Sequence, residues 1–163
     1  QQLATLKADI LADPVLAAKP MNSDGAFDIA AVYNATVAPD FYVWRQSVDE
    51  ADILNNGLDF TLVDGLTVGK RDEWSNWIFK SGSCNPSKAN IRAGIIDVWS
   101  GTAPKIAVQV SVWGHCQKKA SRVEKLFATG AGTAAIAGGS GPATTTILDA
   151  ITYQDVEAAR NLP

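Results

Sequence analysis

The sequence has few residues of the kinds that most often build reaction centres or covalent frameworks. Its 163 residues include one histidine, one methionine and two cysteines. Cys84 and Cys116 are too few for a disulfide framework, although one bond between them stays open, and a single histidine cannot build a metal site by itself. No segment carries a recognisable catalytic constellation. These shortages predict a protein that is not an enzyme and that has no cofactor or metal.

Strong charge and long apolar runs are also absent. The formal net charge is −3 at pH 7, whereas general attraction to nucleic acid needs clustered lysine and arginine. No apolar run approaches the ~20 residues that a membrane-spanning helix needs. The first residues, QQLATLKADIL, lack the charged and then apolar layout of a signal peptide. We therefore expect a soluble protein made in the cytoplasm, with neither membrane nor nucleic acid as a binding partner.

Apolar residues are plentiful and recur mostly at helical spacing. They make up 47% of the chain, which is long enough to build the core of one domain. Their spacing predicts helices over residues 1–12, 26–36, 67–80 and 86–99. Ser23 or Asp24 is expected to cap the second of these, whose apolar face is Ala26, Ile29, Ala30 and Tyr33, and Trp74, Trp77 and Ile78 share one face of the third. A Ser-to-Glu capping pattern at 47–50 predicts another short helix that ends at Gly57, and residues 14–20 are expected to form a turn. Five tryptophans are expected mainly in the core, and one or two at the surface would act as interface anchors.

Residues 104–128 carry two competing patterns. Ile106, Val108, Val110 and Val112 alternate with smaller or polar residues, which is typical of a strand. A helical stripe that starts at Ile106 and continues to residue 127 is longer than this alternation. We predict one long helix over 104–128, with strand over 105–113 as the alternative.

The segment that follows is rich in glycine and threonine. Five of the fourteen residues 129–142 are glycine, and residues 143–151 have strand propensity. A small hairpin is expected, with residues 134–137 pairing with the segment after the glycines. Because an isolated hairpin is marginal in water, we expect residues 129–148 to be mobile in the free subunit and to order against a neighbour. On this interpretation, deleting residues 132–146 would leave a folded, soluble monomer that cannot assemble.

The predicted fold class is mainly α. A single domain over 1–163 would consist of a compact helical body at 1–128, a hairpin arm at 129–151 and a short helix at 152–161, capped by Thr152. The arm is a natural interface, since a strand added to a neighbour satisfies its backbone groups. Basic residues on the predicted long helix are a second candidate, although such runs are usually solvated. The candidate interface residues are Lys118, Lys119, Arg122, Lys125, Ile136, Thr145 and Ile147.

His115 and Cys116 are the only adjacent pair with catalytic character. A thiol beside an imidazole can be an activated nucleophile. Neighbours on a helix point about 100° apart, however, so these two side chains do not face each other. A small thiol enzyme or hydrolase is therefore the alternative from another functional class.

Both ends of the chain resemble a known kind of protein. SRVEKLFATGAG at 121–132 and ITYQDVEAAR at 151–160 resemble the C-terminus of small virion structural proteins of tailed bacteriophages and prophages. LATLKADILADP at 3–14 and DGAFDIAAVYNA at 24–35 resemble the N-terminus of the same group. The resemblance does not include the region of Cys84 and Cys116, and it carries no catalytic residues over.

The resemblance implies a virion component, made in the bacterial host cytoplasm, of the neck or head–tail connector type. Such an adaptor would form a ring with copies of itself and contact other virion proteins such as portal or tail components. Nucleic acid would be present only as DNA that passes through the ring. A capsid decoration protein or a tail protein is the alternative within the same class.

Overall fold

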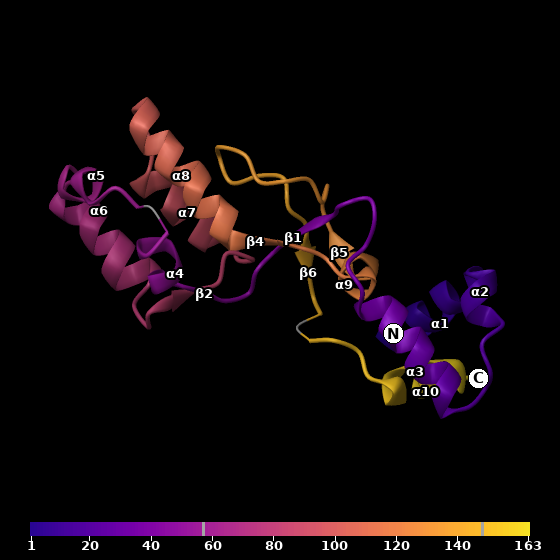
Figure 1. Ribbon diagram of the computed structural model, residues 1–163. Coiled ribbons are helices and arrows are strands. Elements are labelled where there is room, and N and C mark those ends of the chain that lie inside the picture. The colour runs from indigo at the N-terminus through magenta and orange to yellow at the C-terminus, as the bar shows by residue number, and fades with distance from the viewer. Residues whose placement is uncertain (57, 148) are drawn as a thin grey trace.

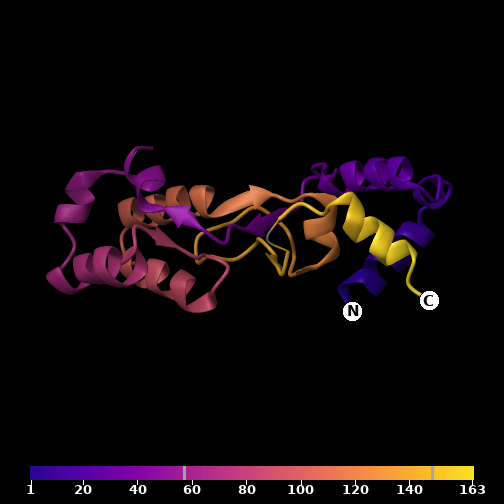
Figure 2. The same ribbon diagram turned by 90° about the horizontal axis from the view of Figure 1, so that it is seen from below.

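The computed structural model describes residues 1–56, 58–147 and 149–163. The chain is 53% helical with only short strands, which confirms the predicted mainly α class. The molecule is elongated, with a helical lobe at each end and short strands between them (Figure 1). A view turned by 90° shows the same two lobes and the same narrow middle (Figure 2).

The terminal lobe holds both chain ends. It consists of α1 (Gln2–Ala12), α2 (Pro14–Ala17), α3 (Ser23–Asn34), α9 (Arg122–Leu126) and α10 (Tyr153–Arg160). The predicted apolar face of α3 is confirmed, because Ala26, Ile29, Ala30 and Tyr33 are all buried. They share one core cluster with buried residues of α1 and α10. The first and last helices therefore close the same core.

The tryptophan lobe is built from the middle of the sequence. It consists of the paired strands β2 (Val48–Asp49) and β3 (Ser83–Cys84), the α-helices α4 (Glu50–Leu54), α5 (Phe60–Asp64), α6 (Val68–Asp72), α7 (Ala89–Val98) and α8 (Ala103–Cys116), and the π-helix η1 (Glu73–Ile78). Its core contains four tryptophans, each at most 2% exposed: Trp44, Trp74, Trp99 and Trp113. The expected C-terminal stop of α4, Gly57, lies outside the described residues.

Trp77 departs from the sequence expectation. It was expected on one buried stripe with Trp74 and Ile78, but its side chain is 76% exposed. The reason is the wider turn of η1, in which the Phe79 amide donates to the Trp74 carbonyl five residues earlier. That turn directs Trp74, Ile78 and Phe79 into the core and leaves Trp77 outside.

The two lobes are joined by a waist of short strands. It comprises β1 (Tyr42–Trp44), β4 (Gln117–Lys119), β5 (Ala128–Thr129) and β6 (Thr144–Thr145). β1 pairs antiparallel with β4, and β5 pairs antiparallel with β6. β1 is also hydrogen-bonded to the residue just before β6, because the Trp44 amide donates to the Ala143 carbonyl at 2.9 Å. The waist therefore has its own small core of Val43, Ala120 and Ala143.

The predicted long helix over 104–128 is wrong in its second half. Residues 103–116 are helical, as predicted against the strand alternative, but the chain then forms β4 and a second, short helix, α9. Two contacts explain the break. β4 satisfies the backbone of β1, and Ser121 with Glu124 forms a capping box that starts α9 anew. The pattern Ser-x-x-Glu at 121–124 was the sequence signal for this start.

A hairpin near the C-terminus is present, but it is not a separate arm. Its strands are β5 and β6. Residues 134–137 do not pair with the described residues of 143–151, and Ile136 instead forms a bridge with Ser140 inside the loop. The loop between the strands folds back onto α8. There the Gly138 amide donates to Gln109 at 2.7 Å, and the Ala135 amide donates to Gln117 at 2.8 Å. The loop therefore has partners within its own chain, which argues against the expectation that this segment orders only against a neighbour.

Candidate interaction surface

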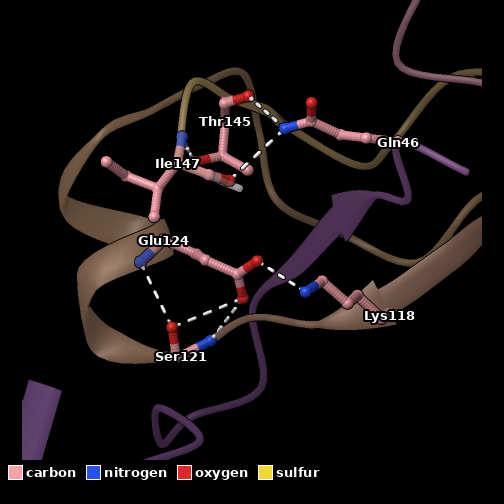
Figure 3. A network of polar contacts seen from close by, with 6 residues as sticks. All are labelled: Gln46, Lys118, Ser121, Glu124, Thr145 and Ile147. Atoms are coloured by element: carbon pink, nitrogen blue, oxygen red, sulfur yellow. Dashed lines mark hydrogen bonds and ion pairs between the residues drawn. The ribbon is translucent and has the colours of Figure 1, made fainter. Parts of the chain in front are cut away.

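A polar network lies at the centre of the waist, where α9 meets β4. Glu124 is 7% exposed, and its carboxylate accepts from the Ser121 amide at 3.0 Å and lies 2.6 Å from Lys118 Nζ. Figure 3 shows Lys118 reaching from β4 toward Glu124, which in turn caps α9. Because the Glu124 carboxylate both caps α9 and pairs with Lys118, it links the start of α9 to β4.

On the same side of the waist, Gln46 binds the backbone of β6 and of the segment that follows it. Its Nε2 donates to the backbone carbonyls of Thr145 and Ile147, at 3.2 and 3.3 Å (Figure 3). Two hollows open beside this network, of about 260 and 400 Å³, and both are lined by Lys118, Glu124 and Asp149. Lys119 also lines the first hollow and Arg45 the second, so each carries two bases and two acids, which is the chemistry of a polar contact surface.

The predicted basic face does not exist as one surface. Lys118 pairs with Glu124, and Lys119 pairs with Asp40 at 2.7 Å. Arg122 lies between Asp9 and Asp13, and Lys125 lies over the ring of Phe41 at 5.4 Å. The break between β4 and α9 distributes these residues over different directions, so each positive charge meets a partner within the chain.

Arg122 is the centre of a cluster that sequence reasoning missed. Its guanidinium donates to Asp9 at 3.1 Å and to Asp13 at 2.9 Å, and it lies over the ring of the buried Tyr33. The hydrogen bond from Arg122 holds the pKa of Asp13 below its usual value. Tyr33 donates to Asp9, and burial raises the pKa of its hydroxyl. This cluster ties α1, α3 and α9 together, and no spacing in the sequence indicates it.

The three remaining predicted interface residues have different surroundings. Ile136 is 61% exposed at the tip of the β5–β6 loop. Thr145 is buried in β6, and Ile147 is half-buried against the core of the terminal lobe. Ile136 is therefore accessible to a partner, whereas Thr145 contributes to the fold of the waist.

His115 and Cys116 lie at the end of α8 but do not form a nucleophile and base. Cys116 and Cys84 are both free and buried in the core of the tryptophan lobe. Burial raises the pKa of the Cys84 thiol to about 12, and it raises the pKa of the Cys116 thiol above its usual range. Both thiols are therefore protonated near neutral pH, and a protonated thiol is a poor nucleophile.

We expect both cysteines to be unreactive in the folded protein at pH 7. A maleimide or dithiobis-nitrobenzoate reagent should label neither thiol until denaturant is added, and then label two per chain. Rapid labelling of one thiol without denaturant would contradict this burial. It would also revive the thiol enzyme alternative.

Over residues 1–56, 58–147 and 149–163, no group of three or more side chains of the metal-binding types converges. Within the same ranges, no helix has the length and hydropathy of a membrane span. The best candidates for contact with a partner are exposed side chains, and Trp77 is the largest of those in the described residues.

Comparisons of the chain with models of protein families, with curated proteins and with solved structures gave no match.

Proposed function

We propose that this chain is a non-enzymatic structural subunit of a tailed bacteriophage virion, and that it forms the closed ring of a head–tail connector. The observation that carries the proposal is the exposure of Trp77 on an ordered helix, in a chain whose other four tryptophans are buried. Tryptophan is strongly enriched among the residues that dominate binding energy at interfaces. The resemblance of both chain ends to virion proteins indicates that the assembly is part of a phage particle.

The shape of the subunit supports a ring. Its two ends are unlike, since one lobe is built around tryptophans and the other around the two chain ends (Figure 1). A head-to-tail contact between unlike ends is heterologous, and it forms a ring when the rotation between neighbouring subunits closes. The paired strands of the waist connect the two lobes, so that one subunit can present a different end to each of its neighbours.

The charge distribution supports protein partners over nucleic acid. Each of the four basic residues between Lys118 and Lys125 already meets a carboxylate or an aromatic ring within the chain. Neutralising phosphates would mean breaking these contacts. Partners of the ring are therefore the portal and tail components, with DNA only passing through.

The test is the assembly state of the purified chain, alone and with purified portal rings. Native mass spectrometry and negative-stain electron microscopy should show one closed ring of a single copy number, bound once per portal. A subunit that stays monomeric under all these conditions would contradict the proposal. Binding to capsids in hundreds of copies would instead identify a decoration protein, and binding along tails a tail protein.

A further inference from the structure

Trp77 is exposed together with a positive charge. Lys80 follows it by three residues, is exposed, and lies in the turn that ends η1. No ion pair of Lys80 is found within the described part of the chain. The outer surface at the end of η1 therefore offers an indole with its N–H donor and a free ammonium group.

The terminal lobe contains a hollow of complementary character. It measures about 260 Å³ and lies among α1, α10 and the chain that follows β6. Most of its lining is apolar, from Leu3, Leu6, Phe127, Ile147 and Ile151. Two acids, Asp149 and Asp155, stand at this lining, and no base does so among the described residues.

We propose that Trp77 of one subunit inserts into this hollow on a second copy of the chain, where Lys80 meets Asp149. The inference rests on the proposed function, because it names the contact that would build the ring. η1 and the hollow belong to opposite lobes of the elongated subunit, so one chain cannot bring them together by itself (Figure 1). The contact is therefore between copies, and in the proposed ring it is heterologous.

The physical chemistry of the two surfaces favours this occupant. Inserting an indole removes both its own apolar surface and that of the hollow from water, which favours association. The indole N–H needs an acceptor once it is buried, and the Asp149 and Asp155 carboxylates supply acceptors at the lining. Within the described residues Asp149 has no ion-pair partner, which leaves it available for Lys80.

Two other hollows among the described residues fit an indole less well. The one beside Arg122 is lined by Asp9, Arg122 and Lys125 with two apolar residues, and the one beside Asn34 is almost wholly polar. The volume of the terminal hollow indicates whether a side chain or a free ligand fits it better. The terminal hollow is smaller than the range of about 300–1,000 Å³ that is usual for small-molecule sites. A single large side chain is therefore its best occupant.

The first experiment compares two exposed aromatic residues of the same lobe. Trp77→Ala should raise the dissociation constant between subunits at least about 30-fold, as expected for loss of a dominant anchor. Phe60→Ala is the matched control, because Phe60 is also exposed, at 59%, but is not part of η1. It should change the constant less than about threefold, as most interface or surface positions do. Analytical ultracentrifugation measures both, and circular dichroism checks that both variants are folded.

The second experiment tests the acceptor by reversing charge. Lys80→Glu and Asp149→Lys should each weaken assembly, because each places like charges together, and the double variant should recover most of the lost affinity. Rings that tolerate Trp77→Ala, or a double variant no better than the single ones, would overturn the contact while leaving the ring intact. A wild-type chain that never self-associates would instead overturn the ring itself, and the contact with it. Reciprocal dimers in place of rings would show that the contact is not heterologous.

Discussion

Replacing Trp113 by alanine is expected to lower the free energy of unfolding by about 3–5 kcal/mol. Trp113 is fully buried near the end of α8, and its ring packs edge-to-face against Trp44 with centroids 5.5 Å apart. It also supports the loop between β5 and β6, because a Cβ at Gly139 would lie 2.9 Å from the Trp113 ring. Truncation therefore opens a cavity where α8, β1 and the loop meet.

One feature of Trp113 places the expected loss in free energy of unfolding toward the lower end of this range. Its indole N–H has no hydrogen-bond partner among the described residues. A buried donor without a partner costs about 1–3 kcal/mol, and alanine removes that cost together with the ring. Trp113→Phe should then be much milder than Trp113→Ala, since it removes the unpaired donor and keeps most of the packing.

Denaturation in urea, followed by circular dichroism, measures this effect. Phe60→Ala is the control, because it deletes an aromatic side chain that is 59% exposed in the same lobe and should change the free energy of unfolding by less than about 0.5 kcal/mol. If both alanine variants lost the same stability, the difference in burial between Trp113 and Phe60 would be contradicted.

Sequence patterns located the helices whose ends carry local signals. Thr152 was expected to cap the last helix, and it forms a full capping box with Asp155. Other caps were misjudged by a few residues. The carboxylate of Asp13 starts α2, where a turn was expected, and Asn22 caps α3 in place of Ser23 or Asp24. Several polar residues compete at each helix start, and the sequence does not say which one turns its side chain toward the free amides.

The larger errors came from contacts between distant segments. Whether residues 117–119 continue the helix or pair with β1 depends on the backbone of residues 42–44, far away in the sequence. The exposure of Trp77 depends on a π-helix, which apolar spacing at α-helical periods does not reveal. For the candidate surface, the sequence could name basic residues but not the carboxylates that neutralise them.

The Gly-rich segment gives the last and largest expected effect. Deleting residues 132–146 should abolish cooperative folding, where the sequence alone suggested a folded monomer unable to assemble. The deletion removes β6 and the fully buried Ala143 from the waist. It also removes those backbone partners of β1 that do not belong to β4, since the Tyr42 amide donates to Gly132, the Ala143 amide donates to Tyr42, and the Trp44 amide donates to Ala143.

The deletion also leaves polar groups of α8 and β4 without partners. Gln109 is 1% exposed, and its side-chain oxygen accepts from Gly138 within the deleted segment. An unsatisfied buried polar group costs about 1–3 kcal/mol, and several arise together here. A domain is stable by only about 5–15 kcal/mol, so losses at β1, Gln109 and the core of the waist exceed what the fold can lose.

Near-UV circular dichroism and a urea titration of the deletion variant measure this outcome. Ile136→Ser is the matched control, because Ile136 lies in the same segment but is exposed, so its substitution should leave the unfolding transition in place. A deletion variant with a normal unfolding transition and lost assembly would contradict the packing of the loop on α8. The segment would then be an appendage for binding a neighbour, and the contact between copies would have to be sought there in place of Trp77.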